Sequence, residues 1–134
     1  MNPRVQAILN FWFEETPPEK RFKKDESFDL LIRNKFLSDY EKASNDELND
    51  WKLNAKSSLA LVILFDQFSR NIFRNDKKAF SQDFKTLEIV YNAIDSGFLD
   101  VMSQSEKFFM ILPLIHSEEI KDHEIAYSLL DKHL

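Results

Sequence analysis

The longest unbroken apolar run of the chain covers residues 59–65, and a dense polar cluster follows it directly. Five of the next nine residues carry a carboxylate, amide or guanidinium group: Asp66, Gln67, Arg70, Asn71 and Arg74. At about 100° per residue on an α-helix, these five side chains fall on one arc of roughly 140°. The pattern predicts a central helix over about residues 55–73, buried all round in its first half and on one side only in its second.

Three helices are predicted before the central one. The first begins at Asn2-Pro3, because Asn is a good N-cap and Pro suits the first helical position, and it ends at Pro17-Pro18. The second covers about residues 25–43, and its expected inward-facing residues are Phe28, Leu31, Ile32, Phe36 and Tyr40. Residues 44–47 have the form of a capping box, which predicts a short third helix that carries Trp51.

Three more helices are predicted after the central one. One spans residues 84–96, and Gly97, the only glycine of the chain, stands where a left-handed C′ residue is wanted. The next opens at a second capping box over residues 103–106, and Pro113 interrupts or kinks it. The last starts at Ser117, with two acidic residues in its first turn, and runs to the end of the chain.

No stretch shows the alternation of a half-buried strand, and one glycine with four prolines argues against a turn-rich β architecture. The 134 residues are enough for one domain with a sizeable core, to which thirteen phenylalanines contribute much of the volume. We therefore predict a single all-α domain over residues 1–134, with about seven helices joined by short loops and packed as antiparallel pairs. No repeat recurs at a fixed spacing.

Charge and composition exclude several classes of function. A formal net charge of −5 argues against nucleic acid as the main partner, because phosphate binding needs a basic face. The local basic run at residues 20–24 is interpreted as a solvated loop. The chain has no cysteine and no segment near the roughly 20 apolar residues that span a bilayer, and its N-terminus lacks the form of a signal peptide. These features predict no membrane association and a cytoplasmic location.

The polar half of the central helix has two interpretations. Asp66 and Arg70 are spaced i, i+4 and can form an internal ion pair, while Arg74 reaches another helix or solvent. Alternatively, Arg70 and Arg74 form a fork for a carboxylate or phosphate, with the amides of Gln67 and Asn71 as neutral donors. The spacing leaves both interpretations open.

A second group of candidate residues is His116, Ser117 and Glu118, just after Pro113. A histidine at a helix entrance can serve as an acid or base, or as a capping and packing group. His116 and His123 with the neighbouring glutamates do not match a recognised zinc spacing, so we expect no metal site and no cofactor.

Several motifs follow one another along the chain: ILNFWF at 8–13, Trp51, LALVILFDQFSRNIFR at 59–74, AF at 79–80 and LPLIHSEE at 112–119. Together they resemble the domain-of-unknown-function 924 family. That family has DQFPRN followed closely by Arg, and later PxxHSE. The resemblance implies a tetratricopeptide-like α-α superhelix in a soluble, mostly bacterial protein, with no activity attached. The motif positions are Trp12, Asp66, Gln67, Arg70, Asn71, Arg74, His116, Ser117 and Glu118.

The chain departs from that family at two points. Ser69 stands where the family usually has Pro, which should let the helix continue through this position. Family members also continue into further helical sequence with a motif like FGRFPHRN, which is absent here. The resemblance therefore implies a domain shortened at its C-terminus, an exposed apolar surface and self-association through the last helix.

Two classes of function follow. The first is a binding or interaction domain for a protein, a peptide or a small anion, with the polar residues 66–74, Trp12, His116 and Glu118 as its contact surface. The second is an enzyme for a small anionic substrate, in which Arg70 and Arg74 hold the anion and His116 or Asp66 transfers the proton. A degenerate family member without retained activity is the third possibility.

Overall fold

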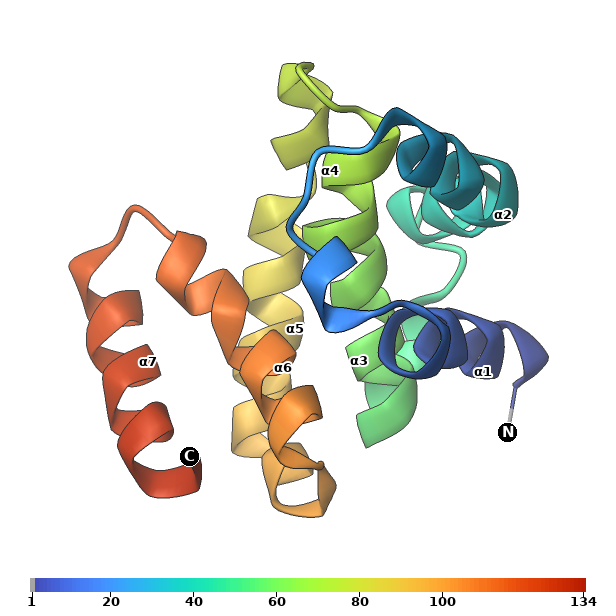
Figure 1. Cartoon of the computed structure of the whole chain (residues 1–134). Coiled ribbons are helices and arrows are strands. Elements are labelled where there is room, and N and C mark those ends of the chain that lie inside the picture. Colours follow the sequence, from blue (N-terminus) through green and yellow to red (C-terminus); the bar gives the residue numbers. More distant parts are fainter. Residues whose placement is uncertain (1) are drawn as a thin grey trace.

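The chain folds into helices joined by short connections, in a computed structural model that describes residues 2–134 (Figure 1). The α-helices are α1 (Pro3–Leu9), α2 (Glu26–Ser44), α3 (Ala55–Val62), α4 (Ser69–Ile72), α5 (Asp83–Asp95), α6 (Gln104–His116) and α7 (Ile120–His133). Short 3₁₀ segments are η2 (Pro18–Lys20), η3 (Asn49–Leu53), η5 (Lys77–Phe80) and η6 (Phe98–Val101). No strand occurs in this part of the chain. The all-α prediction is confirmed, whereas the tetratricopeptide-like superhelix stays a prediction.

Two π-helical segments interrupt the regular α-helices. The segment η1 (Asn10–Glu15) continues α1, and η4 (Ile63–Phe68) joins α3 to α4, so that the central helix runs without a break from residue 55 to residue 72. The helix continues through Ser69, as predicted. The π turns were not foreseen, because the apolar pattern is compatible with an α-helix throughout. Single π turns occur often at functional sites.

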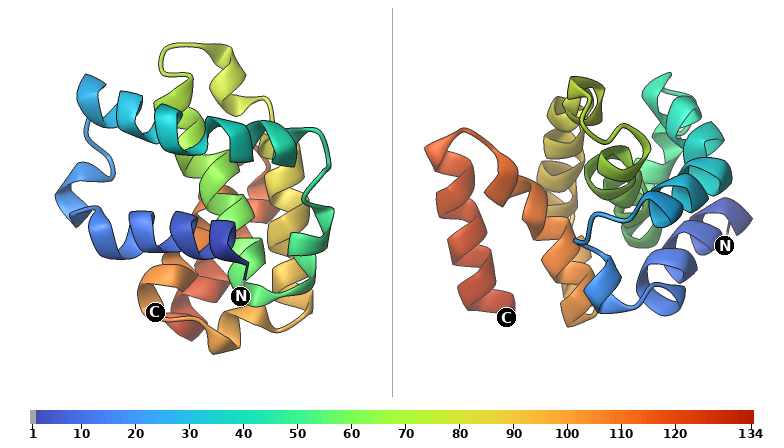
Figure 2. Two further views of the ribbon diagram at one scale, coloured as in Figure 1. Left: turned by 90° about the vertical axis from the view of Figure 1, so that its right-hand side faces the viewer. Right: turned by 45° about the horizontal axis from the view of Figure 1, so that its top comes forward.

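The central helix lies in the middle of the molecule (Figures 1 and 2). On one side it contacts α1 and α2, and α2 crosses over its C-terminal half. On the other side it contacts α5 and α6, and α7 is the outermost helix, packed mainly on α6. This arrangement surrounds α3 with other helices and buries η4 and α4, in which Arg70 alone is partly exposed. The prediction that the second half of the central helix is buried on one side only is therefore wrong, because α2, α5 and α6 pack around it.

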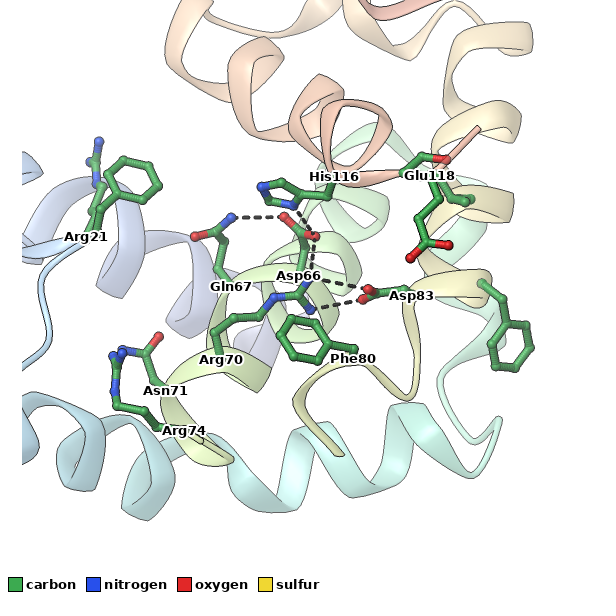
Figure 3. A pocket seen from close by; sticks show the side chains of 14 residues that line it. Arg21, Asp66, Gln67, Arg70, Asn71, Arg74, Phe80, Asp83, His116 and Glu118 are labelled. Atoms are coloured by element: carbon green, nitrogen blue, oxygen red, sulfur yellow. Dashed lines mark hydrogen bonds and ion pairs between the residues drawn. The ribbon is translucent and has the colours of Figure 1, made fainter. Parts of the chain in front are cut away.

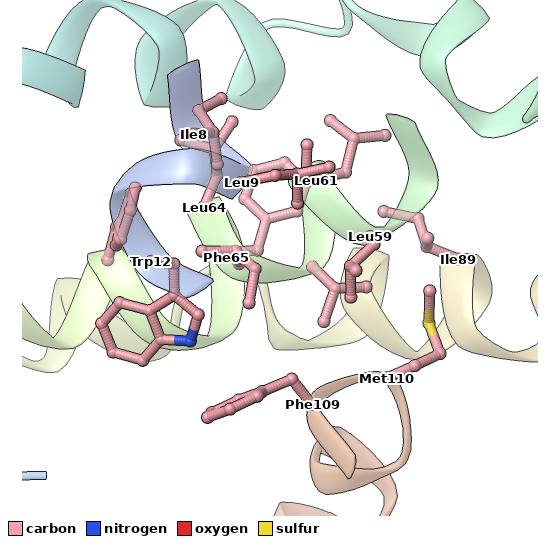
Figure 4. Packing of buried hydrophobic residues seen from close by; sticks show 14 of the residues in the cluster. Ile8, Leu9, Trp12, Leu59, Leu61, Leu64, Phe65, Ile89, Phe109 and Met110 are labelled. Carbon is pink, nitrogen blue, oxygen red and sulfur yellow. The ribbon is translucent and has the colours of Figure 1, made fainter. Parts of the chain in front are cut away.

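Aromatic side chains fill much of the core between the first helix and the central helix. Trp12 and Phe68 are both fully buried, with ring centroids 5.7 Å apart in an edge-to-face arrangement. Phe68 also stacks on Phe36 at 4.8 Å, and Trp12 meets Phe109 from α6 at 5.6 Å (Figure 4). Such pairs are stabilising beyond their buried area. The core therefore ties α1, α2 and α6 to the helix that carries the polar cluster.

Most of the predicted helix boundaries are correct. The side chain of Asn2 caps α1, the capping box at Ser103 and Glu106 opens α6, and Gly97 has the left-handed φ of 74° that its position requires. Pro113 lies inside α6, which continues to His116. None of the helices in residues 2–134 combines the length and the apolar character that a bilayer crossing requires.

Three local predictions are wrong. Ser44 does not cap a new helix: it is the last residue of α2, and its hydroxyl donates to the carbonyl of Tyr40. Leu31 does not face inward but is 42% exposed, because it lies at the edge of the buried stripe of α2. The last helix begins at Ile120 rather than Ser117, since the Ser117 hydroxyl accepts from the N–H of Glu119 in the turn before it.

Candidate functional site

A cleft of about 940 Å³ opens over the polar half of the central helix (Figure 3). Its floor is η4 and α4, one wall is formed by η5 and the start of α5, and the end of α6 closes it above. Residues 21 and 22, which follow η2, line it as well. Seven predicted site residues line this cleft: Asp66, Gln67, Arg70, Asn71, Arg74, His116 and Glu118.

Asp66 is the buried centre of the site, with 2% of its side chain exposed. One carboxylate oxygen lies 3.0 Å from Nδ1 of His116, and the other accepts from Nε2 of Gln67 at 2.9 Å. The guanidinium of Arg70 lies 3.5 Å from the first oxygen. A buried carboxylate destabilises a protein unless it is paired and hydrogen-bonded. The contacts with His116, Gln67 and Arg70 meet this requirement for Asp66.

Arg70 is held by several groups of the protein. Its Nη1 donates to the carbonyls of Phe65 and Ala79, at 3.2 and 2.9 Å, and to the Ser69 hydroxyl. The same nitrogen lies 2.9 Å from the carboxylate of Asp83, at the start of α5. Arg70 therefore joins the central helix to η5 and α5, and its charge is balanced by Asp83 and Asp66.

Asn71 and Arg74 both reach Asp29 of α2. The amide of Asn71 donates to Asp29 Oδ1 at 2.9 Å, and Nη2 of Arg74 donates to the same oxygen at 2.9 Å. Hydrogen bonding to Asp29 raises the pKa of Arg74. Arg70 and Arg74 thus each have their own carboxylate, and the partners of the polar residues on the central helix come from α2, α5 and α6. These contacts agree with the ion-pair interpretation.

His116 ends α6 with 39% of its side chain exposed at the cleft. Its Nδ1 faces Asp66, whereas Nε2 forms no hydrogen bond with the described residues. A carboxylate that accepts from Nδ1 fixes the ring so that Nε2 can accept a proton from a bound molecule. Ser117 points away to the buried Asp122, and Glu118 is exposed at the rim. Among the residues that the structure describes, His116 is the histidine that lines the cleft.

Trp12 is not part of this surface, contrary to the prediction, because its indole is fully buried in the core. Its carbonyl instead accepts a hydrogen bond from Nε of Arg21 at 3.2 Å. Arg21 lines the cleft and lies over the rings of Trp12, Phe13 and Phe109, at 5.6 to 5.8 Å from their centroids. The interpretation of residues 20–24 as a solvated loop is therefore wrong for Arg21.

All the phenylalanines that are exposed among residues 2–134 gather at this cleft. Phe22, Phe80 and Phe84 are 68%, 56% and 60% exposed, and each lines it. Phe80 lies against the guanidinium of Arg70, 4.6 Å from ring centroid to Cζ (Figure 3). Within the same residues, no group of three or more histidine and acidic side chains is placed to hold a metal ion. The site thus combines charged groups on its floor with apolar rings at its edge.

The family model described as "Bacterial protein of unknown function (DUF924)" matches residues 8–134. The chain belongs to this family. A solved structure of a protein of unknown function from Agrobacterium tumefaciens, ATU0120, is similar to it, with a TM-score of 0.91 and 32% identity. The match covers 96% of the DUF924 chain and 73% of the Agrobacterium protein. Comparison with curated proteins finds no match.

Sequence reasoning missed three charged residues of the DUF924 site: Arg21, Asp29 and Asp83. Asp29 and Asp83 lie in the first turns of α2 and α5, where acidic residues are common for reasons of helix electrostatics alone. Arg21 lies in a basic run that carries no other signal. The two phenylalanines four residues apart at 80 and 84 were the one sign in the sequence that could have extended the site to η5 and α5.

Proposed function

We propose that this DUF924 protein is a binding domain whose cleft above the polar half of the central helix holds a small amphipathic molecule. The observation that carries the proposal is the gathering of exposed phenylalanines at this one cleft, beside an ordered charged floor. Apolar side chains left exposed together mark interaction sites more often than chance exposure does. A volume of about 940 Å³ also lies within the range of small-molecule sites.

Other residues of the protein hold the charged side chains on the floor of the cleft. Asp66, Arg70 and Arg74 each have partners from other helices, so that binding a ligand need not order these long side chains. Rigid polar groups lose little conformational entropy on binding, which leaves more of the interaction energy for affinity. This organisation supports a binding role for the cleft.

Ligand screening with a matched pair of variants tests the proposal. Thermal-shift and ¹H–¹⁵N NMR screening of small carboxylates, phosphates, nucleotides and aromatic fragments should give ligands whose chemical-shift changes centre on the cleft. Phe84→Ala should weaken such ligands, whereas Leu53→Ala, which trims an even more exposed apolar side chain away from the cleft, should not. A folded protein with no ligand at the cleft would contradict the proposal and favour a family member without retained activity.

An enzyme for a small anionic substrate is the second candidate, and the orientation of His116 favours it. Buried Asp66 holds Nδ1, and the free Nε2 faces the cleft, which is the arrangement of a general base with its orienting carboxylate. Turnover of any compound from an ester, amide and phosphate panel that His116→Gln abolishes would support catalysis. Unchanged turnover in that variant would assign the activity to other groups.

A further inference from the structure

Three arginines line the cleft, and they differ in how their charge is balanced. Arg70 is paired with Asp83 and Asp66, and Arg74 is paired with Asp29. Among the described residues, Arg21 forms no ion pair with a carboxylate. The cleft therefore contains one cation whose charge the protein leaves unbalanced.

Arg21 is nevertheless held firmly. Its Nε donates to the carbonyl of Trp12 at 3.2 Å, and its Nη2 donates to the carbonyl of Phe13 at 3.4 Å. Both carbonyls belong to the π segment η1, close to its C-terminal end, where the backbone dipoles favour a positive charge. The guanidinium also lies over three aromatic rings. These contacts fix its plane and leave Nη1 without a hydrogen bond to the described residues.

The surroundings of Arg21 favour an anion as the missing partner. Partial burial lowers the pKa of Arg21, because it removes some of the water that would otherwise solvate the positive charge. An anion that reaches Nη1 would restore this lost solvation and gain charge-assisted hydrogen bonds. Arginine is well suited to carboxylate and phosphate groups, because its planar fork matches their oxygens.

The charged and aromatic residues around Arg21 indicate how such an anion would be oriented in the cleft. Figure 3 shows Arg21 on one side of the cleft and Asp83 on the other, with Gln67 and Asp66 between them. Asp83 and Glu118 repel a second negative charge at the far side. Phe22 follows Arg21 directly and stacks on Phe109, with 6.0 Å between the ring centroids, so an apolar surface adjoins the guanidinium. The anionic group and the apolar part of a ligand thus have adjacent places.

We propose that Arg21 binds the carboxylate or phosphate of a small organic anion, whose apolar part lies against the exposed phenylalanines of the cleft. The inference rests on the proposed binding function and names the class of its ligand. It also moves anion recognition from Arg70 and Arg74, which are already paired, to a residue outside the central helix.

Matched probes test the inference on the intact chain by ¹H–¹⁵N NMR titration. Benzoate and benzamide have nearly the same shape but differ in charge, and phenyl phosphate carries an apolar group that inorganic phosphate lacks. We expect benzoate to bind at least about tenfold more tightly than benzamide, since a charge-assisted hydrogen bond is lost with the neutral probe. Phenyl phosphate should likewise exceed inorganic phosphate, with the Arg21 Nε–H signal shifting in each bound state.

Two variants separate Arg21 from its basic neighbours. Arg21→Gln should weaken benzoate about tenfold or more, whereas Lys23→Gln, which removes the same charge outside the cleft, should change it less than about twofold. Equal binding of benzoate and benzamide at the cleft would overturn the role of Arg21 but leave the binding function standing. Unchanged benzoate binding by Arg21→Gln would do the same. Because the benzoate–benzamide comparison uses the wild-type chain, it decides the question even if the variant does not fold.

Discussion

Replacing Arg70 with alanine tests whether this side chain belongs to the scaffold or waits for a ligand. In the structure its guanidinium donates to the carbonyls of Phe65 and Ala79 and pairs with Asp83. It also lies 3.5 Å from the buried Asp66. If these contacts hold the helices together, the Arg70→Ala variant loses stability even when no ligand is present.

The expected loss can be worked out from the contacts. The buried carbonyl of Ala79 loses its donor at a cost of about 1 kcal/mol, whereas the carbonyl of Phe65 keeps the Ser69 hydroxyl as a donor. The pair with the 41% exposed Asp83 contributes no more than about 1 kcal/mol. Asp66 keeps His116 and Gln67 as partners, so it is not left uncompensated. We therefore expect a loss of about 2 kcal/mol, below the roughly 3–5 kcal/mol seen when one member of a fully buried pair is removed.

Urea unfolding followed by circular dichroism at 222 nm measures this loss, provided that the m-value does not change. Arg33→Ala is the matched control, because Arg33 donates to a single carbonyl, that of Ile72, at 3.1 Å. It should cost about 1 kcal/mol. A loss below about 1 kcal/mol for Arg70→Ala, no larger than that of the control, would refute the reasoning and return Arg70 to the list of free anion-binding groups.

Three further predictions concern the core, the pH dependence and association. Phe68→Ala should cost about 3–5 kcal/mol in urea unfolding, because the ring is fully buried among aromatic neighbours; a loss near 1 kcal/mol would contradict this packing. Burial alone would raise the pKa of Glu106, but hydrogen bonds from Lys56 and from the Ser103 backbone outweigh it and hold the pKa below 4.5. Ionised Glu106 therefore stabilises the fold above that pH, and this stability is lost as the pH falls through the lower folded-state value. Glu106→Gln should flatten the acid side of a plot of melting temperature against pH, and an unchanged acid side would count against the pairing. Finally, we expect self-association through α7, on which Ile120 and Tyr127 are 74% and 64% exposed, and light scattering that shows a monomer at high concentration would rule it out.

Features that depend on neighbouring residues could be predicted from the sequence. The cap at Asn2, the capping box at Ser103 and the left-handed Gly97 are local, so each follows from a few residues and simple backbone rules. The same kind of local pattern gives a wrong prediction at residues 44–47, where it resembles a capping box but opens no helix. There the N–H of Glu47 bonds to the carbonyl of Lys42, and the pattern belongs to the turn after a helix instead of the start of one.

The partners of the candidate site could not be predicted, since they come from distant parts of the chain. Arg74 meets Asp29, which is 45 residues away, and His116 meets Asp66, which is 50 residues away. Such pairs depend on how α2 and α6 pack on the central helix, and no spacing within one helix contains that information. Its place in a family motif predicts Trp12 on the contact surface, whereas packing against Phe68 and Phe109 buries it.

The two π turns have a consequence for how this sequence can change. The carbonyls that hold Arg21 lie in η1, and the carbonyl of Phe65, which Arg70 uses, lies in η4. A π turn holds one residue more than an α turn, so deleting one residue from either segment would restore a regular α-helix and leave the residues beyond it in register. Such a deletion would instead redirect the carbonyls of Trp12 and Phe13, or that of Phe65, so it should loosen Arg21 or Arg70 without displacing the rest of the helix.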